Sequence, residues 1–443
     1  MGLTDIILYP IYVILFYFLF SARRKNYTDP VLQFYHKQGF WIKALAVIPF
    51  TLFNTILSPG DSYLLFYAEG SNMYRLILGD FSHVTWLYSS AADFDQAFLR
   101  NSLNLGYLKI ENNYMIARIV ALLSFPAFGK YLILNLFFSM IAFSGAWRLY
   151  RFFYEQYPHL HKQFAIAILY LPTFVFWSAG ILKDPLCTAS IGWITYSLYE
   201  VFYKKKNLLI NVFILILFGY LLFVIKTYIL ISYVPFFFVY LVLKNVTLVR
   251  NRLLRIVIVL GIIISSMALF TTVTKQLAST LTSYGGEDIT KSVSIYQKAY
   301  AEQADASSNF SLGVEFDGSL SSLIKIAPMA IVATLYRPFL WESKKITTLL
   351  SSFESLATML FTLIVFFRAG PRNFFSSILK DPVILYCLLF ALLFALFVGA
   401  TTANFGSLVR YKIPCMPFYL IALFLIQDRV RKIKSSPVTS QTA

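Results

Sequence analysis

The stretch LLINVFILILFGYLLFVIKTYILISYVPFFFVYLVL, residues 208–243, decides the fold class, because Lys226 is its only charged side chain. A helix needs about twenty apolar residues to cross a bilayer while satisfying its own backbone hydrogen bonds. The stretch therefore predicts two spans, 208–225 and 227–243, joined by a short turn. Lys226 is expected to extend from that turn to the membrane surface.

Similar apolar runs recur along the chain, and the composition agrees with them. Of the 443 residues, 58% are hydrophobic and 13% are charged, and the mean hydropathy is +0.67, whereas a soluble domain carries about 25% charged residues. We predict an all-α polytopic membrane protein with about eleven transmembrane helices. The expected spans are 5–20, 41–58, 131–148, 163–181, 186–202, 208–225, 227–243, 253–271, 348–367, 382–400 and 411–427.

Basic residues predict the orientation of these spans. Of the 38 Lys and Arg, 21 fall in short stretches that we place in the cytosol, as the positive-inside rule requires. The amino terminus is then outside and the carboxyl terminus cytosolic, and the net charge of +17 needs no nucleic-acid partner to explain it. These stretches are 22–40, 148–163, 203–207, 244–255, 368–380 and the tail after Gln427.

The domain organisation follows from the same pattern. We expect an added transmembrane helix and basic cytosolic loop over 1–40, one membrane-embedded domain over 41–430 and a disordered cytosolic tail over 431–443. Two large outer-face loops, 59–130 and 272–347, are each expected to contain an interfacial or re-entrant helix, at 114–128 and 323–335.

Asp61 opens the first outer loop directly after Ser58-Pro59-Gly60. A carboxylate at a membrane exit is placed to deprotonate an incoming hydroxyl, although it could equally cap the turn after Pro-Gly. In the turn Lys183-Asp184-Pro185, an ion pair at the mouth of a cavity would hold a phosphate through Lys183. The alternative is a helix start in which Lys183 extends to the surface.

Cations also gather late in the chain, at Arg337 within YRPFLWE (336–342) and at Arg410-Tyr411-Lys412 before the last span. A guanidinium fits a phosphate through its planar fork, and the alternative for Arg337 is anchoring of the aromatic neighbours at the interface. Two cations on the side that the positive-inside rule disfavours need a local reason, and an anionic ligand supplies one.

Other chemistry finds no support in the sequence. No phosphate-binding Walker loop, dinucleotide fingerprint, HExxH motif or nucleophile elbow is present, which argues against a nucleotide-driven pump. The three cysteines, Cys187, Cys387 and Cys415, lack the spacing of a metal site.

Three features together resemble the membrane-embedded C-class (GT-C) glycosyltransferases: Gly60-Asp61 before a long outer loop, Pro172 with the Lys183-Asp184-Pro185 turn, and Arg410-Tyr411 with Pro414 before the final span. The resemblance covers residues 41–427 loosely. It implies inverting transfer of a sugar from a polyprenyl-phosphate carrier to an envelope glycan, lipid or protein, on the outer face of a bacterial inner (plasma) membrane.

The resemblance also implies roles for single residues. Asp61 is the expected catalytic carboxylate. No adjacent acidic pair stands in the first outer loop, which leaves the metal question open: no cofactor is certain, and a divalent metal ion stays an option. The remaining assignments are Asp80, Asp93 and Asp95 as acceptor or metal candidates, Arg410, Lys412, Arg337 and Lys183 as phosphate-binding residues, and Asp184 and Tyr411 as supporting residues.

Two alternatives remain. An O-antigen or exopolysaccharide polymerase or ligase is similar in having about eleven spans and a large late outer loop with arginines, but such enzymes rely on arginine and histidine rather than on an acidic first loop. A lipid-linked glycan flippase or other transporter needs ionisable residues deep within its spans, where this sequence has few.

Overall fold

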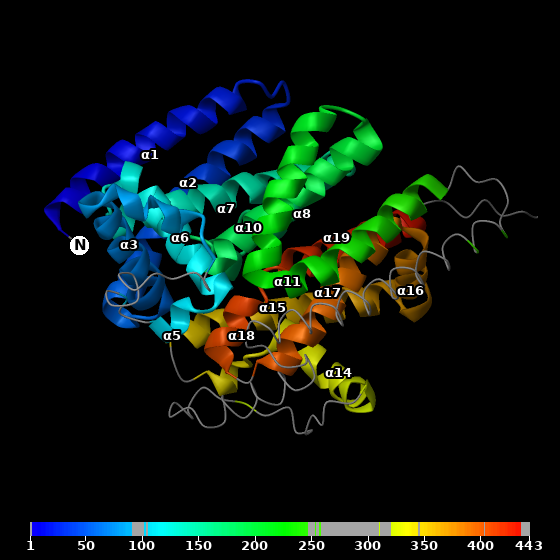
Figure 1. The fold of residues 1–443 in the computed structure, drawn as a ribbon. Helices are drawn as coiled ribbons and strands as arrows, with labels where there is room; N and C mark the ends of the chain where they lie inside the picture. The colour runs from blue at the N-terminus through cyan, green and yellow to red at the C-terminus, as the bar shows by residue number, and fades with distance from the viewer. Residues whose placement is uncertain are drawn as a thin grey trace, which may run out of the picture. The chain divides into compact units, whose positions relative to one another are not determined.

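The computed structural model describes residues 2–90, 102, 105–246, 253, 257, 310, 320–343, 346–402 and 404–435. The regular elements in these ranges are all helices (Figure 1). The chain divides into two compact units, Met1–Leu230 and Ile231–Ala443. The expected domain boundary at residue 40 falls inside a helix, Pro30–Leu52, and is not where the units divide.

The first unit begins with two long helices, α1 (Leu3–Arg24) and α2 (Pro30–Leu52). The carboxylate of Asp29 accepts a hydrogen bond from the Val31 amide at 2.8 Å, and Pro30 occupies the first helical position. Both are helix-start features, so α2 begins well before the expected span 41–58. The π-helix η1 (Phe53–Leu57) prolongs it.

Helices α7 (Tyr131–Tyr154) and α10 (Lys183–Tyr199) form the centre of this unit. They approach closely at Gly145 and Gly192, where a Cβ on Gly192 would overlap the carbonyl oxygen of Gly145. Small residues permit this distance, as is common between membrane helices. The unit's other elements are η2 (Asp61–Tyr67), α3 (Ala68–Gly79), η3 (Phe81–Leu87), α5 (Leu105–Leu108), α6 (Glu111–Ala127), η4 (Pro158–Leu160), α8 (His161–Ile168), α9 (Pro172–Trp177), η5 (Glu200–Lys204) and the first part of α11 (Leu208–Val246).

The described residues of 59–130, the expected first outer loop, form a helical subregion with its own core. The segment expected as an interfacial helix at 114–128 lies almost wholly in α6, which packs against α3 and buries Tyr114, Ala117 and Ala121. Its place at a membrane interface stays a prediction. At the tightest point Gly70 of α3 faces Val120, leaving no room for a Cβ.

The second unit contains the rest of α11 and six further α-helices among the described residues. Helix α14 covers the segment expected as an interfacial helix at 323–335, and it packs on α17 where Gly399 meets the backbone of Ala330. The hydroxyl of Tyr386 donates to that of Tyr233 at 2.6 Å within an aromatic core. The elements are α14 (Leu320–Tyr336), η7 (Leu340–Glu342), α15 (Ile346–Ala369), α16 (Pro371–Lys380), α17 (Pro382–Thr401), α18 (Phe405–Tyr411) and α19 (Met416–Ser435).

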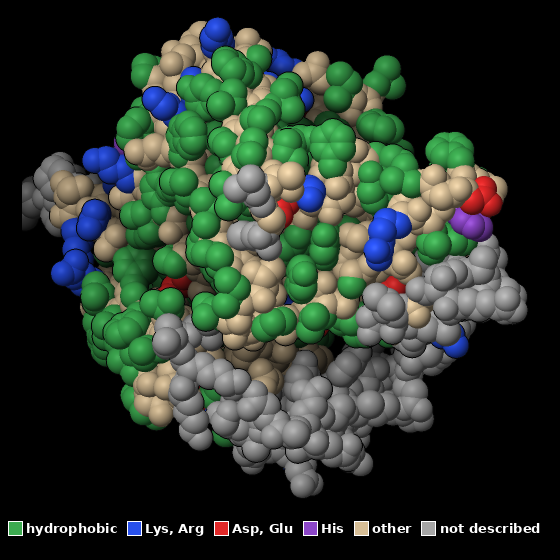
Figure 2. All heavy atoms as spheres, turned by 90° about the vertical axis from the view of Figure 1, so that its left-hand side faces the viewer, with side chains coloured by type: hydrophobic (Ala, Val, Ile, Leu, Met, Phe, Trp, Pro, Cys, Tyr) green, Lys and Arg blue, Asp and Glu red, His purple; other side chains and the backbone are tan. Residues whose placement is uncertain are grey.

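Six described helices are long and apolar enough to cross a membrane, or seven if α18 and α19, bent by 62°, count as one span. The six are Thr4–Arg24, Pro30–Leu57, Tyr131–Tyr154, Leu208–Lys244, Thr348–Ala369 and Pro382–Thr401. Large apolar side chains such as Phe18 on α1 and Leu209 on α11 are exposed, and Figure 2 shows hydrophobic side chains over much of one face. Such faces suit contact with lipid.

The expected eleven spans are not all recovered. The span 163–181 is wrong as one helix, because α8 ends at Ile168 and α9 starts at Pro172. The proline ring disfavours the helical conformation of the residue before it. The spans 208–225 and 227–243 correspond to two helices joined as α11 across a kink at the expected residue, Lys226, where φ is −150° and ψ is 75°. That each of them crosses the membrane separately stays a prediction. The span 253–271 lies outside the described residues except Leu253 and Val257.

Candidate functional site

Lys412 lies at the break between α18 and α19 and is only 1% exposed. The side chain of Asn404 starts α18 by accepting hydrogen bonds from the amides of Gly406 and Ser407. After Tyr411 the chain turns, since Pro414 disfavours the helical conformation for the residue before it. The break therefore directs a lysine into the interior of the second unit.

The ammonium of Lys412 is held by neutral groups. Its Nζ donates to the hydroxyl of Ser355 at 2.8 Å and to the carbonyl oxygen of Arg337 at 3.1 Å. Among the residues that the structure describes, no carboxylate lies within ion-pair distance of this nitrogen, although Glu354 acts on it electrostatically. An ammonium has three donors, so the two bonds leave capacity for an anion.

Arg337, by contrast, is engaged by a carboxylate. Its Nε donates to both oxygens of Glu342, at 3.0 and 3.1 Å, and Nη2 donates to the same side chain. The rings of Phe310 and Phe405 lie 4.4 and 5.1 Å from its guanidinium carbon. These contacts fix the backbone of Arg337, whose carbonyl oxygen binds Lys412.

Arg410 and Tyr411 occupy the last turn of α18, both half-buried, with the guanidinium carbon 5.5 Å from the Tyr411 ring centre. The structure thus brings the backbone of Arg337 into contact with Lys412, and Arg410 precedes Lys412 by two residues at the same break. We call Arg410, Lys412 and Arg337 the second-unit cations, a name for their place in the chain and not for contact between their charged groups. They are three of the four cations that the sequence assigned to phosphate.

In the first unit, Lys183 and Asp184 begin α10, as the helix-start alternative expects. The carboxylate of Asp184 is fully buried and accepts from Nζ of Lys226 at 2.6 Å. Lys226 is 7% exposed and turns inward to a partner, rather than outward to the membrane surface. Two opposite charges isolated in apolar sequence were a signal for this pair. Lys183 donates to the Asn112 amide oxygen at 2.7 Å.

The acidic candidates are separated from one another. Asp61 is half-buried and is the first residue of η2. Another residue of the same helix, Phe66, has its ring centre 5.9 Å from Nζ of Lys183. Asp80 is exposed and caps η3 by accepting from the Ser82 amide at 2.9 Å, a bond that lowers the pKa of Asp80. Asp93 and Asp95 lie outside the described residues.

No group of three or more His, Cys, Asp or Glu side chains that could hold a metal ion occurs in the described ranges. The three cysteines are buried and free. A divalent ion at the acidic first-loop residues therefore stays a proposal without geometric support.

Lys43 is a buried residue to which the sequence analysis gave no role. It lies in α2, and its ammonium donates to three neutral oxygens, the carbonyls of Val175 and Ser178 and the hydroxyl of Ser178. All three donors are satisfied, so Lys43 joins α2 to the end of α9. A lone lysine inside the expected span 41–58 was the available signal.

Comparison with protein-family models, with curated proteins and with solved structures gives no match. The fold and the site therefore define the class. The chain is an α-helical, multi-pass membrane protein with several helices of spanning length and charged groups buried at two helix breaks.

Proposed function

We propose that this protein transfers a sugar from a polyprenyl-phosphate carrier to an acceptor hydroxyl at the outer face of a bacterial inner membrane. The observation that supports the proposal best is the buried ammonium of Lys412, which is bound by two neutral groups, the Ser355 hydroxyl and the Arg337 carbonyl oxygen. A preorganised cation in a water-poor site stabilises a developing phosphate charge more strongly than a cation in bulk water does.

The proposed reaction uses few groups. The acceptor oxygen forms a bond to the anomeric carbon as the bond from that carbon to the carrier phosphate breaks, and the electron pair goes to the phosphate oxygen. A carboxylate takes the hydroxyl proton. The second-unit cations stabilise the leaving phosphate.

The direct test is transfer by membranes supplied with a radiolabelled polyprenyl-phosphate sugar. Arg410→Ala and Lys412→Met should each lower the transfer rate by about a hundredfold, the effect of removing one preorganised donor. Lys206→Ala, at an exposed lysine of the first unit, is the matched control and should transfer like the wild type. Unchanged rates in well-expressed Arg410→Ala, Lys412→Met and Asp61→Asn would overturn the proposal.

Sidedness is tested separately. We propose an outer amino terminus and a cytosolic carboxyl terminus from the distribution of Lys and Arg. Reporter fusions near residues 155 and 300 should then report the cytosol and the exterior, respectively. The opposite result would place Arg410 on the wrong face for a carrier that presents its sugar outside.

A second candidate function is transport of a lipid-linked glycan. The buried pair between Asp184 and Lys226, at a break in a long apolar helix, supports it, since ionisable residues at broken helices mark transport pathways. Vesicles with the purified protein distinguish the two candidates. A transporter moves the carrier-linked sugar between leaflets without consuming it, whereas a transferase converts it only when an acceptor is present.

A further inference from the structure

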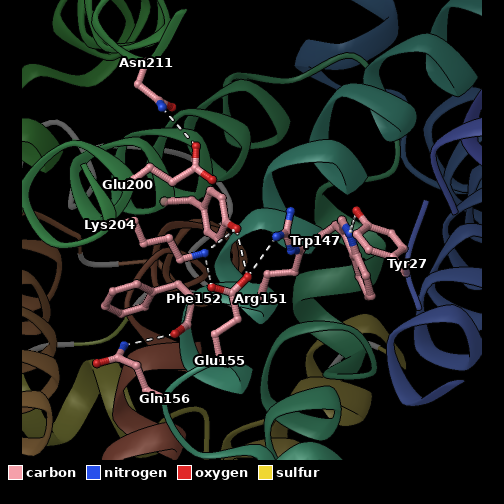
Figure 3. A network of polar contacts seen from close by, with 10 residues as sticks. Tyr27, Trp147, Arg151, Phe152, Glu155, Gln156, Glu200, Lys204 and Asn211 are labelled. Carbon is pink, nitrogen blue, oxygen red and sulfur yellow. Dashed lines mark hydrogen bonds and ion pairs between the residues drawn. The ribbon is translucent and has the colours of Figure 1, made fainter. Parts of the chain in front are cut away.

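A second polar cluster lies in the first unit, where α7 ends and α10 continues into η5 (Figure 3). Glu155 is its centre and is ion-paired with Arg151 at 2.8 Å and with Lys204. The hydroxyl of Tyr196 donates to Glu155 at 2.8 Å and accepts from Lys204 at 3.1 Å. One oxygen of the Glu155 carboxylate is therefore paired with Arg151 and the other with Lys204.

Arg148 lies one turn before Arg151 on α7, and its guanidinium is bound differently. Its central carbon lies 4.4 Å from the ring centre of Trp193 and 4.9 Å from that of Tyr196. Within the described part of the chain, no carboxylate is within ion-pair distance of Arg148. A guanidinium stacked on two aromatic rings keeps its in-plane donors available to an anion.

The neighbouring carboxylate of Glu200 acts on Arg148 electrostatically but forms no ion pair with it. Glu200 accepts a hydrogen bond from the Asn211 amide at 2.9 Å, as Figure 3 shows. In addition, Nε of Arg151 is buried and has no hydrogen-bond partner among the described residues. Three cations thus face two carboxylates that are already bound, which leaves a net positive charge and unused donors.

The surroundings have the character of a bilayer interface. Phe202 and Tyr203 are each 48% exposed and Leu209 is 86% exposed, while Lys205 and Lys206 beside them are exposed too. Aromatic and basic side chains together at the end of membrane helices are typical of the headgroup level, where basic pockets bind anionic lipid.

We propose that Arg148, stacked on Trp193 and Tyr196, binds the phosphate of an anionic phospholipid in the leaflet at this end of α7. The planar fork of the guanidinium donates two parallel hydrogen bonds to phosphate oxygens, while the aromatic rings fix its plane. The acyl chains of the lipid would lie along the exposed apolar side chains near Leu209. This site does not depend on the proposed sugar transfer.

The test measures thermal unfolding of the purified full-length protein in a neutral detergent. Short-chain phosphatidylglycerol is titrated, with short-chain phosphatidylcholine and inorganic phosphate as parallel probes. Phosphatidylglycerol should raise the unfolding temperature saturably, and inorganic phosphate at equal concentration should not. Arg148→Gln should raise the half-saturating phosphatidylglycerol concentration about tenfold or more. The matched control Lys325→Gln, which removes one exposed charge from α14 in the second unit, should change it less than about twofold.

Three results would overturn the proposal: a wild-type titration in Arg148→Gln, an equal loss in Lys325→Gln, or a saturable shift with inorganic phosphate alone. The last would make the site one for soluble anions. If Arg148→Gln does not fold, Arg148→Lys decides, because it keeps the charge and loses the planar fork. It should weaken phosphatidylglycerol several-fold, and an unchanged affinity would contradict the role of Arg148.

Discussion

Lys226 of the first unit and Lys412 of the second are both buried lysines at helix breaks, and they differ in what they bind. The ammonium of Lys226 contacts the Asp184 carboxylate at 2.6 Å, whereas that of Lys412 contacts a hydroxyl and a carbonyl oxygen. The negative charge of the Asp184 carboxylate neutralises the positive charge of Lys226 within the pair. Neutral acceptors stabilise the ammonium but leave its charge to act on other groups.

The difference teaches that burial alone does not identify a functional cation. Breaking a buried pair leaves a charge without compensation, which is strongly destabilising. Removing a buried cation from neutral acceptors leaves only ordinary hydrogen-bond acceptors behind. The first arrangement leaves no uncompensated charge, and the second retains a charge that can serve binding.

The largest expected effect is on the Lys226 pair. Asp184→Asn should lower the free energy of unfolding by about 3–5 kcal/mol, because it leaves the Lys226 ammonium buried without a carboxylate. Reversible unfolding in detergent measures the loss. The double variant Asp184→Leu with Lys226→Met should be more stable than Asp184→Asn, and a wild-type unfolding free energy for Asp184→Asn would contradict the assigned role.

A smaller effect is expected for the ion pair of the second unit. Glu342→Ala removes the hydrogen bonds to Arg337 and to the Phe339 amide, and should cost about 2 kcal/mol of unfolding free energy. The pair is partly exposed, so its loss should be smaller than that in Asp184→Asn. A larger loss would mean that pairing in the second unit matters more than the comparison allows.

Lys412→Met should cost less again, about 1 kcal/mol, since Ser355 also donates to the Arg337 carbonyl oxygen at 3.3 Å and keeps it bonded. The same detergent measurement applies. A stable Lys412→Met protein without transfer activity would separate this lysine from Lys226. A loss as large as that of Asp184→Asn would show that Lys412 is structural.

The smallest effect is expected at Asp80, an exposed cap outside both breaks. The bond from the Ser82 amide lowers the pKa of Asp80. Its stabilisation is therefore complete above the ordinary carboxyl pKa and is lost as pH falls through the lowered pKa. Asp80→Ala should remove this dependence, as hydrogen exchange at η3 would measure between neutral and acidic pH. If hydrogen exchange at η3 depends on pH in the same way in Asp80→Ala and in the wild type, the role assigned to the Asp80 cap is disproved.

Local properties of the fold could be predicted from the sequence. Helices such as α1, α7 and α17 coincide with expected spans because twenty consecutive apolar residues are a property of the sequence itself. The break in 163–181 was missed because hydropathy does not report backbone geometry. Pro172, which is visible in the sequence, was a better indicator of the helix boundary than hydropathy. Likewise Asp29 with Pro30 was an available sign that α2 starts early.

The candidate sites could be predicted in part. The charges of Arg337, Arg410 and Lys412 stood out locally, whereas the contact of Lys412 with Arg337 joins residues 75 positions apart. The pair of Asp184 and Lys226 joins residues 42 positions apart. Contacts of this kind depend on tertiary packing, which hydropathy and charge patterns do not encode. The surface position expected for Lys226 is wrong, because this lysine pairs with Asp184, whereas the phosphate expected at Lys412 stays a prediction.

The break at Lys226 also bears on how often the chain crosses the bilayer. The apolar part of α11, Leu208–Lys244, has 37 residues. As one unbroken helix these residues would be about 55 Å long, whereas the hydrocarbon of a bilayer is about 30 Å thick. Lys226 divides it into two lengths that each suffice for one crossing. If α11 crosses the bilayer twice instead of once, every segment after Lys244 begins on the opposite side of the membrane. The break at Lys226, where the ion pair with Asp184 lies, is therefore the place to test the topology of the rest of the chain.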